Sequence, residues 1–132
     1  MFSSITGDNI GKLILRLTVG GLMIFHGIAK LSHGVDFIAA KLTENGLPAE
    51  LAYGVYAGEL LAPVLLILGL WSRVGAFIVV VNMVFAVGLM HMGDLLTLTQ
   101  HGGWRLELQA FFLLGGLAIL FLGSGRYAFR PD

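Results

Sequence analysis

The sequence contains no cysteine, and only 12% of its 132 residues are charged. The absence of cysteine excludes disulfides, thiolate zinc sites, cysteine-ligated iron–sulfur clusters, thioether-attached haem and thiol redox chemistry within this chain. If the protein takes part in electron transfer, the electron carrier must come from outside the chain. The eight basic and eight acidic side chains cancel. No positive field is therefore available to hold nucleic acid, which we exclude as a partner.

Long apolar runs dominate what is present. Hydrophobic residues make up 57% of the sequence and the mean hydropathy is +0.88, which is typical of an integral membrane protein surrounded by the lipid bilayer. Four continuous apolar runs predict membrane-spanning helices over residues 10–31, 51–70, 74–92 and 105–122. The first run is ~33 Å long as a helix, enough to cross a bilayer. The sequence therefore predicts an all-α, polytopic four-helix transmembrane bundle that forms a single domain over residues 1–132.

The segments outside the spans complete the predicted topology. Residues 1–9 are polar and turn-prone, and Arg16 interrupts the first apolar run, so we interpret that run as a retained helix and not as a secretory signal. Residues 33–50 predict a short amphipathic helix at the membrane interface, with the apolar positions Val35, Phe37, Ile38, Ala39 and Leu42. Lys and Arg residues are slightly more numerous on the side that holds both termini, and such an excess marks the cytoplasmic side. That side has Lys12, Arg73, Arg126 and Arg130, and the other has Lys30, Lys41 and Arg105. The sequence therefore predicts that both termini are cytoplasmic.

Glu59 lies near the middle of the second predicted span. An ionisable group at that depth costs at least ~2.5–3.5 kcal/mol unless another group compensates it. Arg16 of the first span is one candidate partner, because a long side chain can snorkel towards the carboxylate; Lys30 and His26 are the others. A stripe on the first span is expected to face protein, since its members recur every three or four residues: Arg16, Gly20, Met23, Gly27 and Lys30.

The remaining spans carry fewer polar groups. Asn82 and His91 lie on the third span about 180° apart around the helix axis, so both cannot face the bundle core. Pro63 predicts a kink after Glu59 and frees the Glu59 carbonyl. On the fourth span one face is shared by Glu107, Ala110, Phe111, Leu114 and Ala118. Trp71 and Trp104 fit the aromatic belts of the two interfaces.

Two interpretations of these polar residues stay open. The first is structural: Arg16 with Glu59, and Lys30 with Glu107, are ion pairs that fix helix register. The second is a polar pocket that opens towards the outer leaflet, since ionisable groups inside spans are functional candidates. A metal site would need the spacing Glu-x-x-His or His-x-x-x-His, and the candidate ligands His26, His91, Glu59 and Glu107 lack it. We therefore predict no metal site, and we give a b-type haem between His26 and His91 little weight.

Short motifs in a fixed order carry a family resemblance. They are Arg16…Gly20…His26-Gly27…Lys30, Gly46-Leu47-Pro48, Glu59…Pro63…Leu68-Gly69…Arg73, Gly102-Gly103-Trp104 and Gly123-Ser124-Gly125-Arg126-Tyr127. Together they cover nearly the whole chain, which resembles the DoxX family of small four-helix membrane proteins. Two positions depart from the family pattern: Arg105 stands where an acidic residue often follows the Gly-Gly-aromatic stretch, and Ala128-Phe129-Arg130 replaces the usual Ser-Leu-Asp ending.

The resemblance implies an inner-membrane protein of a family described as proposed oxidoreductases or as small subunits of a thiosulfate:quinone oxidoreductase. The leading hypothesis is a membrane subunit that supports quinone-linked redox chemistry, with Glu59 exchanging protons and His26 relaying them. Residues expected to complete the pocket are Arg16, Lys30, Asn82, His91, Trp104 and Glu107. The alternatives are a non-catalytic scaffold that docks a soluble redox enzyme or forms a homo-oligomer, and a transporter of protons or small solutes.

Overall fold

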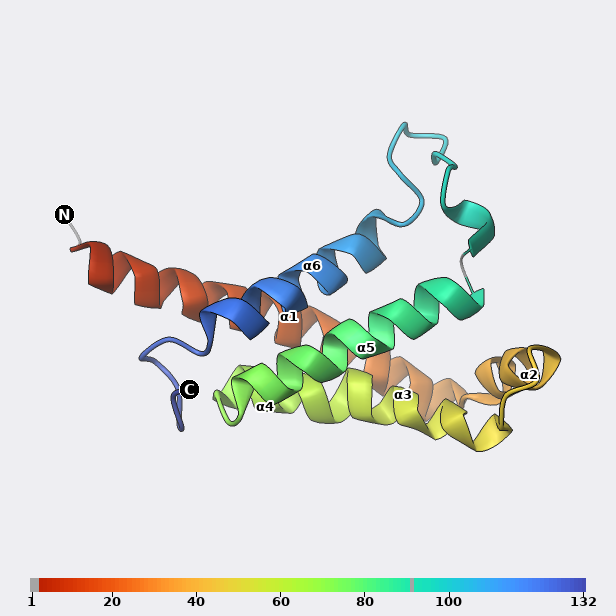
Figure 1. Ribbon diagram of the computed structural model, residues 1–132, viewed down its shortest axis with the longest axis horizontal. Helices are drawn as coiled ribbons and strands as arrows, with labels where there is room; N and C mark the ends of the chain where they lie inside the picture. The colour runs from red at the N-terminus through yellow and green to blue at the C-terminus, as the bar shows by residue number, and fades with distance from the viewer. Residues whose placement is uncertain (1–2, 91) are drawn as a thin grey trace.

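A computed structural model describes residues 3–90 and 92–132 of the chain. This described part is helical, with two isolated bridge pairs and no strand. Its long elements pack side by side as a bundle, and α2 lies at the end of the bundle away from both termini (Figure 1). In chain order the elements are α1 (Ser4–His33), α2 (Asp36–Glu44), η1 (Ala49–Tyr53), α3 (Gly54–Tyr56), η2 (Ala57–Leu61), α4 (Ala62–Leu68), α5 (Ser72–Met90), η3 (Met92–Asp94) and α6 (Glu107–Leu122).

Helix α1 begins earlier than the sequence predicted. Its first residue is Ser4 and not residue 10, because Ser3 acts as an N-cap whose Oγ accepts a hydrogen bond from the Thr6 amide at 3.1 Å. The prediction of a turn-prone segment over residues 1–9 is therefore wrong for residues 4–9, and residues 1–2 lie outside the described part of the chain. The predicted stripe is confirmed over its central part, since Arg16, Gly20, Met23 and Gly27 are buried against the other helices.

The second predicted span, residues 51–70, is helical but not uniform. It begins with a 3₁₀ segment, η1, passes through one turn of α3 into the π-helical turn η2, and ends as α4. Pro63 lies in the first turn of α4, where a missing amide proton is tolerated. The predicted disturbance next to Glu59 is thus a π-helical turn over residues 57–61.

Helices α5 and α6 pack against each other, and α5 follows α4 through a very tight turn. Gly69 (φ 73°) and Trp71 (φ 45°) both adopt left-handed backbone angles in that turn. Helix α6 starts at Glu107, two residues later than predicted, and buries Phe112, Gly116 and Ile119. The predicted face that contains Phe111 and Leu114 points outward, since both side chains are exposed.

The core is apolar and lies between α1, α4, α5 and α6. Its buried members are Val19, Met23, Ala62, Leu66, Ala76, Val79, Met83, Phe112 and Ile119. Many large apolar side chains on the opposite faces of the same helices are exposed. Among the described residues, three helical stretches are long and apolar enough to cross a membrane, Ser4–His33, Ala49–Leu68 and Ser72–Leu89, and Glu107–Leu122 is a shorter apolar helix. Exposed apolar surface on such helices is expected where lipid covers it.

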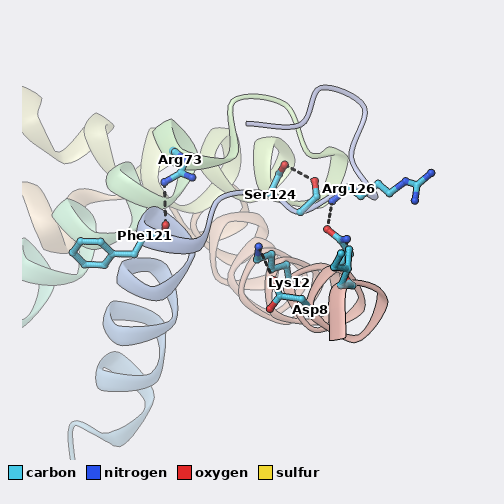
Figure 2. A network of polar contacts seen from close by, with 9 residues as sticks. Asp8, Lys12, Arg73, Phe121, Ser124 and Arg126 are labelled. Atoms are coloured by element: carbon cyan, nitrogen blue, oxygen red, sulfur yellow. Dashed lines mark hydrogen bonds and ion pairs between the residues drawn. The ribbon is translucent and has the colours of Figure 1, made fainter. Parts of the chain in front are cut away.

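The C-terminal segment, residues 123–132, closes the end of the bundle opposite to α2. Arg73 Nη1 donates to the carbonyls of Leu120 (2.7 Å) and Phe121 (3.1 Å) at the C-terminus of α6. The amide of Arg126 donates to Asn9 Oδ1 at 2.8 Å, so this segment also contacts α1 (Figure 2). Cations at a helix C-terminus are stabilising because the last carbonyls carry partial negative charge. The Arg130 amide donates to the Gly69 carbonyl at 2.9 Å, so the segment joins α1 to the α4–α5 turn.

Candidate functional site

The carboxylate of Glu59 is the centre of a small polar cluster inside the bundle. Lys30 Nζ of α1 lies 2.6 Å from Glu59 Oε1. Asn82 Nδ2 of α5 donates to Glu59 Oε2 at 3.2 Å. Each carboxylate oxygen therefore has a partner from a different helix. The Glu59 side chain is 7% exposed and the Lys30 side chain is 28% exposed, so the lysine is the more accessible of the two charges.

The local backbone explains how Glu59 reaches this position. It lies in the π-helical turn η2, and such turns change the direction of side chains relative to a regular helix and occur frequently at functional sites. Gly58 allows Asn82 to approach: a Cβ on Gly58 would lie 2.5 Å from Asn82 Cγ, closer than any real contact. Gly27 likewise allows α1 to contact the Glu59 backbone carbonyl directly. The glycines thus let three backbones converge on one carboxylate.

A large groove opens beside this cluster. Its volume is about 610 Å³, and its walls come from the end of α1, from α2, from the segment η1–η2 and from α5. Only Lys30, Glu59 and Asn82 contribute charged or amide groups, while the other walls are aliphatic, aromatic or glycine: Gly34, Phe37, Ile38, Leu42, Leu51, Gly54, Val55, Ala57, Gly58, Phe77, Ile78, Val81, Phe85, Ala86 and Leu89. An apolar groove with a few convergent polar groups is the usual form of a small-molecule site.

Two features of this groove were missed in the sequence. Phe77, Val81 and Phe85 recur every fourth residue, line the groove and are exposed on α5. This spacing places them on one helix face and could have been noticed. Tyr56 donates from its hydroxyl to the Lys30 carbonyl at 3.2 Å and so fixes the end of α1 next to the cluster. No sequence pattern indicates that contact.

Arg16 does not belong to the groove, and the predicted Arg16–Glu59 pair is wrong. Its guanidinium is fully buried near the opposite end of the bundle. Nη1 donates to the Leu66 carbonyl at 2.9 Å and Nη2 donates to the Tyr127 carbonyl. The side chain therefore binds backbone carbonyls of α4 and of the C-terminal segment, and not the Glu59 carboxylate. The predicted Lys30–Glu107 pair is also wrong, since Lys30 binds Glu59.

The other predicted site residues lie elsewhere. His26 is exposed and packs edge-on against Phe112 of α6, with ring centroids 5.7 Å apart. Trp104 donates from Nε1 to the Leu95 carbonyl at 2.8 Å and lines a second cavity of about 340 Å³ between α5 and α6. Glu107 is exposed at the start of α6. His91 falls outside the described residues, and within them no three His, Asp or Glu side chains gather as metal ligands would.

The DoxX family model matches residues 11–92, which include most of α1, the Glu59 segment and all of α5. This chain belongs to the DoxX family. It is a membrane protein of that family.

Two relatives extend the DoxX match over most of the chain. An "Uncharacterized protein" of Haemophilus influenzae is 35% identical over 120 residues, which cover 86% of this chain and 84% of the relative. "Putative oxidoreductase CatD" of Bacillus subtilis is 31% identical over 124 residues, which cover 92% of this chain and 86% of the relative. No solved structure matches significantly.

Proposed function

We propose that this DoxX protein is a small inner-membrane subunit that supports quinone-linked oxidoreductase chemistry. In this proposal it crosses the membrane four times with both termini in the cytoplasm, α2 lies at the outer interface, and the groove beside Glu59 binds the quinone ring. The electrons come from a redox enzyme partner, since the chain offers no cysteine for a cluster or a thiol.

The observation that carries the proposal is the position of the polar cluster. Asn82 lies near the middle of α5, and the groove continues from it along the Phe77, Val81 and Phe85 face of that helix. A ligand that binds there must bring its polar part close to the bilayer centre. Phospholipids are disfavoured because a charged headgroup at that depth is expensive. A lipophilic molecule with an uncharged carbonyl ring satisfies both the apolar walls and the polar cluster.

The three polar residues have separate roles in this proposal. Lys30 Nζ has donors left beyond the one bound to Glu59, and it would donate to a ring carbonyl oxygen. Glu59 would exchange a proton at its carboxylate, and Asn82 would hold that carboxylate in place. A quinone, when bound, supplies a carrier for two electrons and two protons. The similarity to "Putative oxidoreductase CatD" of Bacillus subtilis supports this class of chemistry.

Binding of a quinone analogue to the purified protein tests the proposal. We expect a short-chain ubiquinone or menaquinone analogue to bind the wild type, and Glu59→Gln to weaken binding about tenfold or more. The charge-assisted bond from Lys30 to Glu59 holds the ammonium that donates to the ring carbonyl, and the variant weakens that bond. A hydrogen bond to a charged group is worth about 1.5–3 kcal/mol, and 1.4 kcal/mol is a factor of ten. Glu107→Gln is the matched control, because Glu107 is an exposed carboxylate outside the groove. Equal binding by the wild type and Glu59→Gln would remove the proposal.

A scaffold without catalysis is the second candidate, and one observation favours it. Lys30 and Asn82 between them bind both oxygens of Glu59, as a purely structural lock between α1, η2 and α5 would require. Pull-down after extraction in mild detergent separates the two functions. A stoichiometric redox partner supports the quinone-linked subunit, whereas a stable homo-oligomer that is indifferent to Glu59→Gln supports the scaffold.

A further inference from the structure

The loop between α5 and α6, residues 95–104, contains no Asp, Glu, Lys or Arg, and four of its ten residues are Leu or Trp. Its sequence is LLTLTQHGGW, and the nearest charged residues are Asp94 and Arg105 at its two ends. Leu96 is 95% exposed and Leu98 is 64% exposed. Side chains of this kind on a loop indicate a surface that another apolar phase covers.

The length of α6 supplies an independent argument, which depends on its role as the fourth span in the proposed topology. Its 16 residues extend ~24 Å at ~1.5 Å per residue. The hydrocarbon core of a typical bilayer is ~30 Å thick. The helix therefore falls ~6 Å short. The α5–α6 loop, which precedes α6 and carries exposed leucines, can supply this length within the membrane.

The hydrogen bonds of the loop suit such a location. The Thr97 amide donates to the Asp94 carbonyl (3.1 Å), the Thr99 amide to the Gly103 carbonyl (2.6 Å) and the Gly102 amide to the Thr99 carbonyl (3.0 Å). The Arg105 amide returns to the Thr97 carbonyl (3.1 Å), and Trp104 Nε1 donates to the Leu95 carbonyl (2.8 Å). Irregular backbone near hydrocarbon is tolerated only where its polar groups are bonded internally.

The position of the loop agrees with this reading. In Figure 1 the teal and light-blue segment between α5 and α6 projects sideways from the bundle and does not extend past the end formed by α2. A loop that projects sideways next to the last turns of α5 lies along the membrane plane when the helices cross it.

We propose that the α5–α6 loop is an interfacial anchor that inserts into the outer boundary between lipid headgroups and acyl chains. Leu96 and Leu98 point into the acyl chains, Trp104 lies at the boundary, and Asp94 and Arg105 stay among the headgroups. The loop thereby completes the fourth crossing that α6 alone is too short to make. This role is independent of any ligand in the groove.

Spin labels on single cysteines test the anchor, since the chain has no native cysteine to remove. Leu96→Cys is labelled with a nitroxide in liposomes that contain the purified protein. Its collision rates with oxygen and with a water-soluble nickel chelate are then compared with those of two reference sites. Phe111→Cys is the lipid reference, because Phe111 is 77% exposed on α6. Arg126→Cys in the C-terminal segment, exposed at the opposite end of the bundle, is the aqueous reference.

We expect the oxygen-to-nickel ratio at Leu96 to exceed that at Arg126 several-fold and to approach that at Phe111. The corresponding depth is about 5–10 Å below the headgroup boundary. A ratio equal to that at Arg126 would overturn the anchor and place the loop in water. Protection from both reagents would also overturn it, since a second copy of the chain would then cover the loop. Neither negative result affects quinone binding, so the anchor and the proposed function fail separately.

Discussion

At the residue scale, Glu59 and Lys30 depend on each other because neither charge is well hydrated. Removing one partner of a buried pair leaves the other uncompensated, whereas replacing both by apolar residues is often neutral. We expect Lys30→Met to lower the free energy of unfolding by about 3 kcal/mol. The double variant Lys30→Met/Glu59→Leu should recover most of that loss. Unfolding in mixed detergent micelles measures both variants.

Lys41→Met is the matched control for that experiment. Lys41 pairs with Glu44 at 3.6 Å, and both side chains are considerably exposed, 38% and 65%. Exposed pairs contribute only about 0–1 kcal/mol, so this variant should stay close to the wild type. The single variant Glu59→Leu completes the cycle. If the loss in the double variant equals the sum of the losses in Lys30→Met and Glu59→Leu, the buried pair is not coupled and its assigned role is wrong.

Gly58 determines how closely Asn82 can approach Glu59. An added methyl would meet Asn82 Cγ at 2.5 Å and Asn82 Cβ at 2.6 Å, so α5 itself must shift and not only the end of a flexible side chain. We expect Gly58→Ala to destabilise the protein by about 1–3 kcal/mol, as overpacking does, and to weaken quinone binding. Gly88→Ala is the control, because its methyl meets no atom within 4 Å and Gly88 does not line the groove. Unchanged binding by Gly58→Ala would show that Asn82 does not hold the carboxylate.

Sequence reasoning at this scale identified the need for a partner at Glu59 but not which residue supplies it. Lys30 and His26 were both close enough along the first span, and the fold selects Lys30 because His26 turns towards Phe112 of α6. Arg16 was misassigned because its partners are backbone carbonyls. One of them belongs to Tyr127, which is 111 positions away in the sequence. Every residue has a backbone carbonyl, so the amino-acid sequence does not reveal which of them accepts a hydrogen bond from Arg16.

At the element scale, a helix with an amphipathic pattern was easier to predict than the buried face of a uniformly apolar helix. The amphipathic pattern of residues 33–50 predicted a short interfacial helix, and the structure has a helix in this range, α2 (Asp36–Glu44). Helix α6 is apolar on all sides, so its periodicity could not reveal that Phe112, Gly116 and Ile119 are the buried face. The π-helical turn was also beyond prediction, because a proline signals only that regular bonding is disturbed.

Several elements form the groove, and one added side chain can occupy part of its volume. Gly54 lines it, and its position has open space around it. We expect Gly54→Leu to reduce quinone affinity at least tenfold, because the new side chain occupies volume that the ring or its tail needs, while the unfolding free energy changes little. Direct binding titration and detergent unfolding measure the two effects.

Gly88→Leu is the matched substitution outside the groove. Gly88 also has no atom within 4 Å of an added Cβ, but it lines the second cavity between α5 and α6. It should leave quinone affinity unchanged. An equal loss of quinone affinity in both variants would indicate a general effect on the bundle. Wild-type affinity in both variants would show that the ligand does not occupy the groove.

At the scale of the whole molecule, the two ends of the bundle have different tasks. The Glu59 cluster and its groove lie between η1–η2, α2 and α5, and the opposite end is held by Arg16, Arg73 and the C-terminal segment. Arg16 joins α1, α4 and that segment through two carbonyls, an arrangement that suits the broad fork of a guanidinium and not a single ammonium. The family motif that contains Arg16 is therefore explained by assembly of the bundle.

Arg16→Lys separates assembly from ligand binding. A lysine can donate to one of the two carbonyls but cannot bridge both. We therefore expect the unfolding free energy to fall by about 1–3 kcal/mol, the cost of leaving a buried acceptor without its donor. Quinone affinity should stay within a factor of two of the wild type, since Arg16 does not line the groove. A loss of affinity as large as that of Glu59→Gln, in protein that remains folded, would return Arg16 to the site and contradict the division between the two ends.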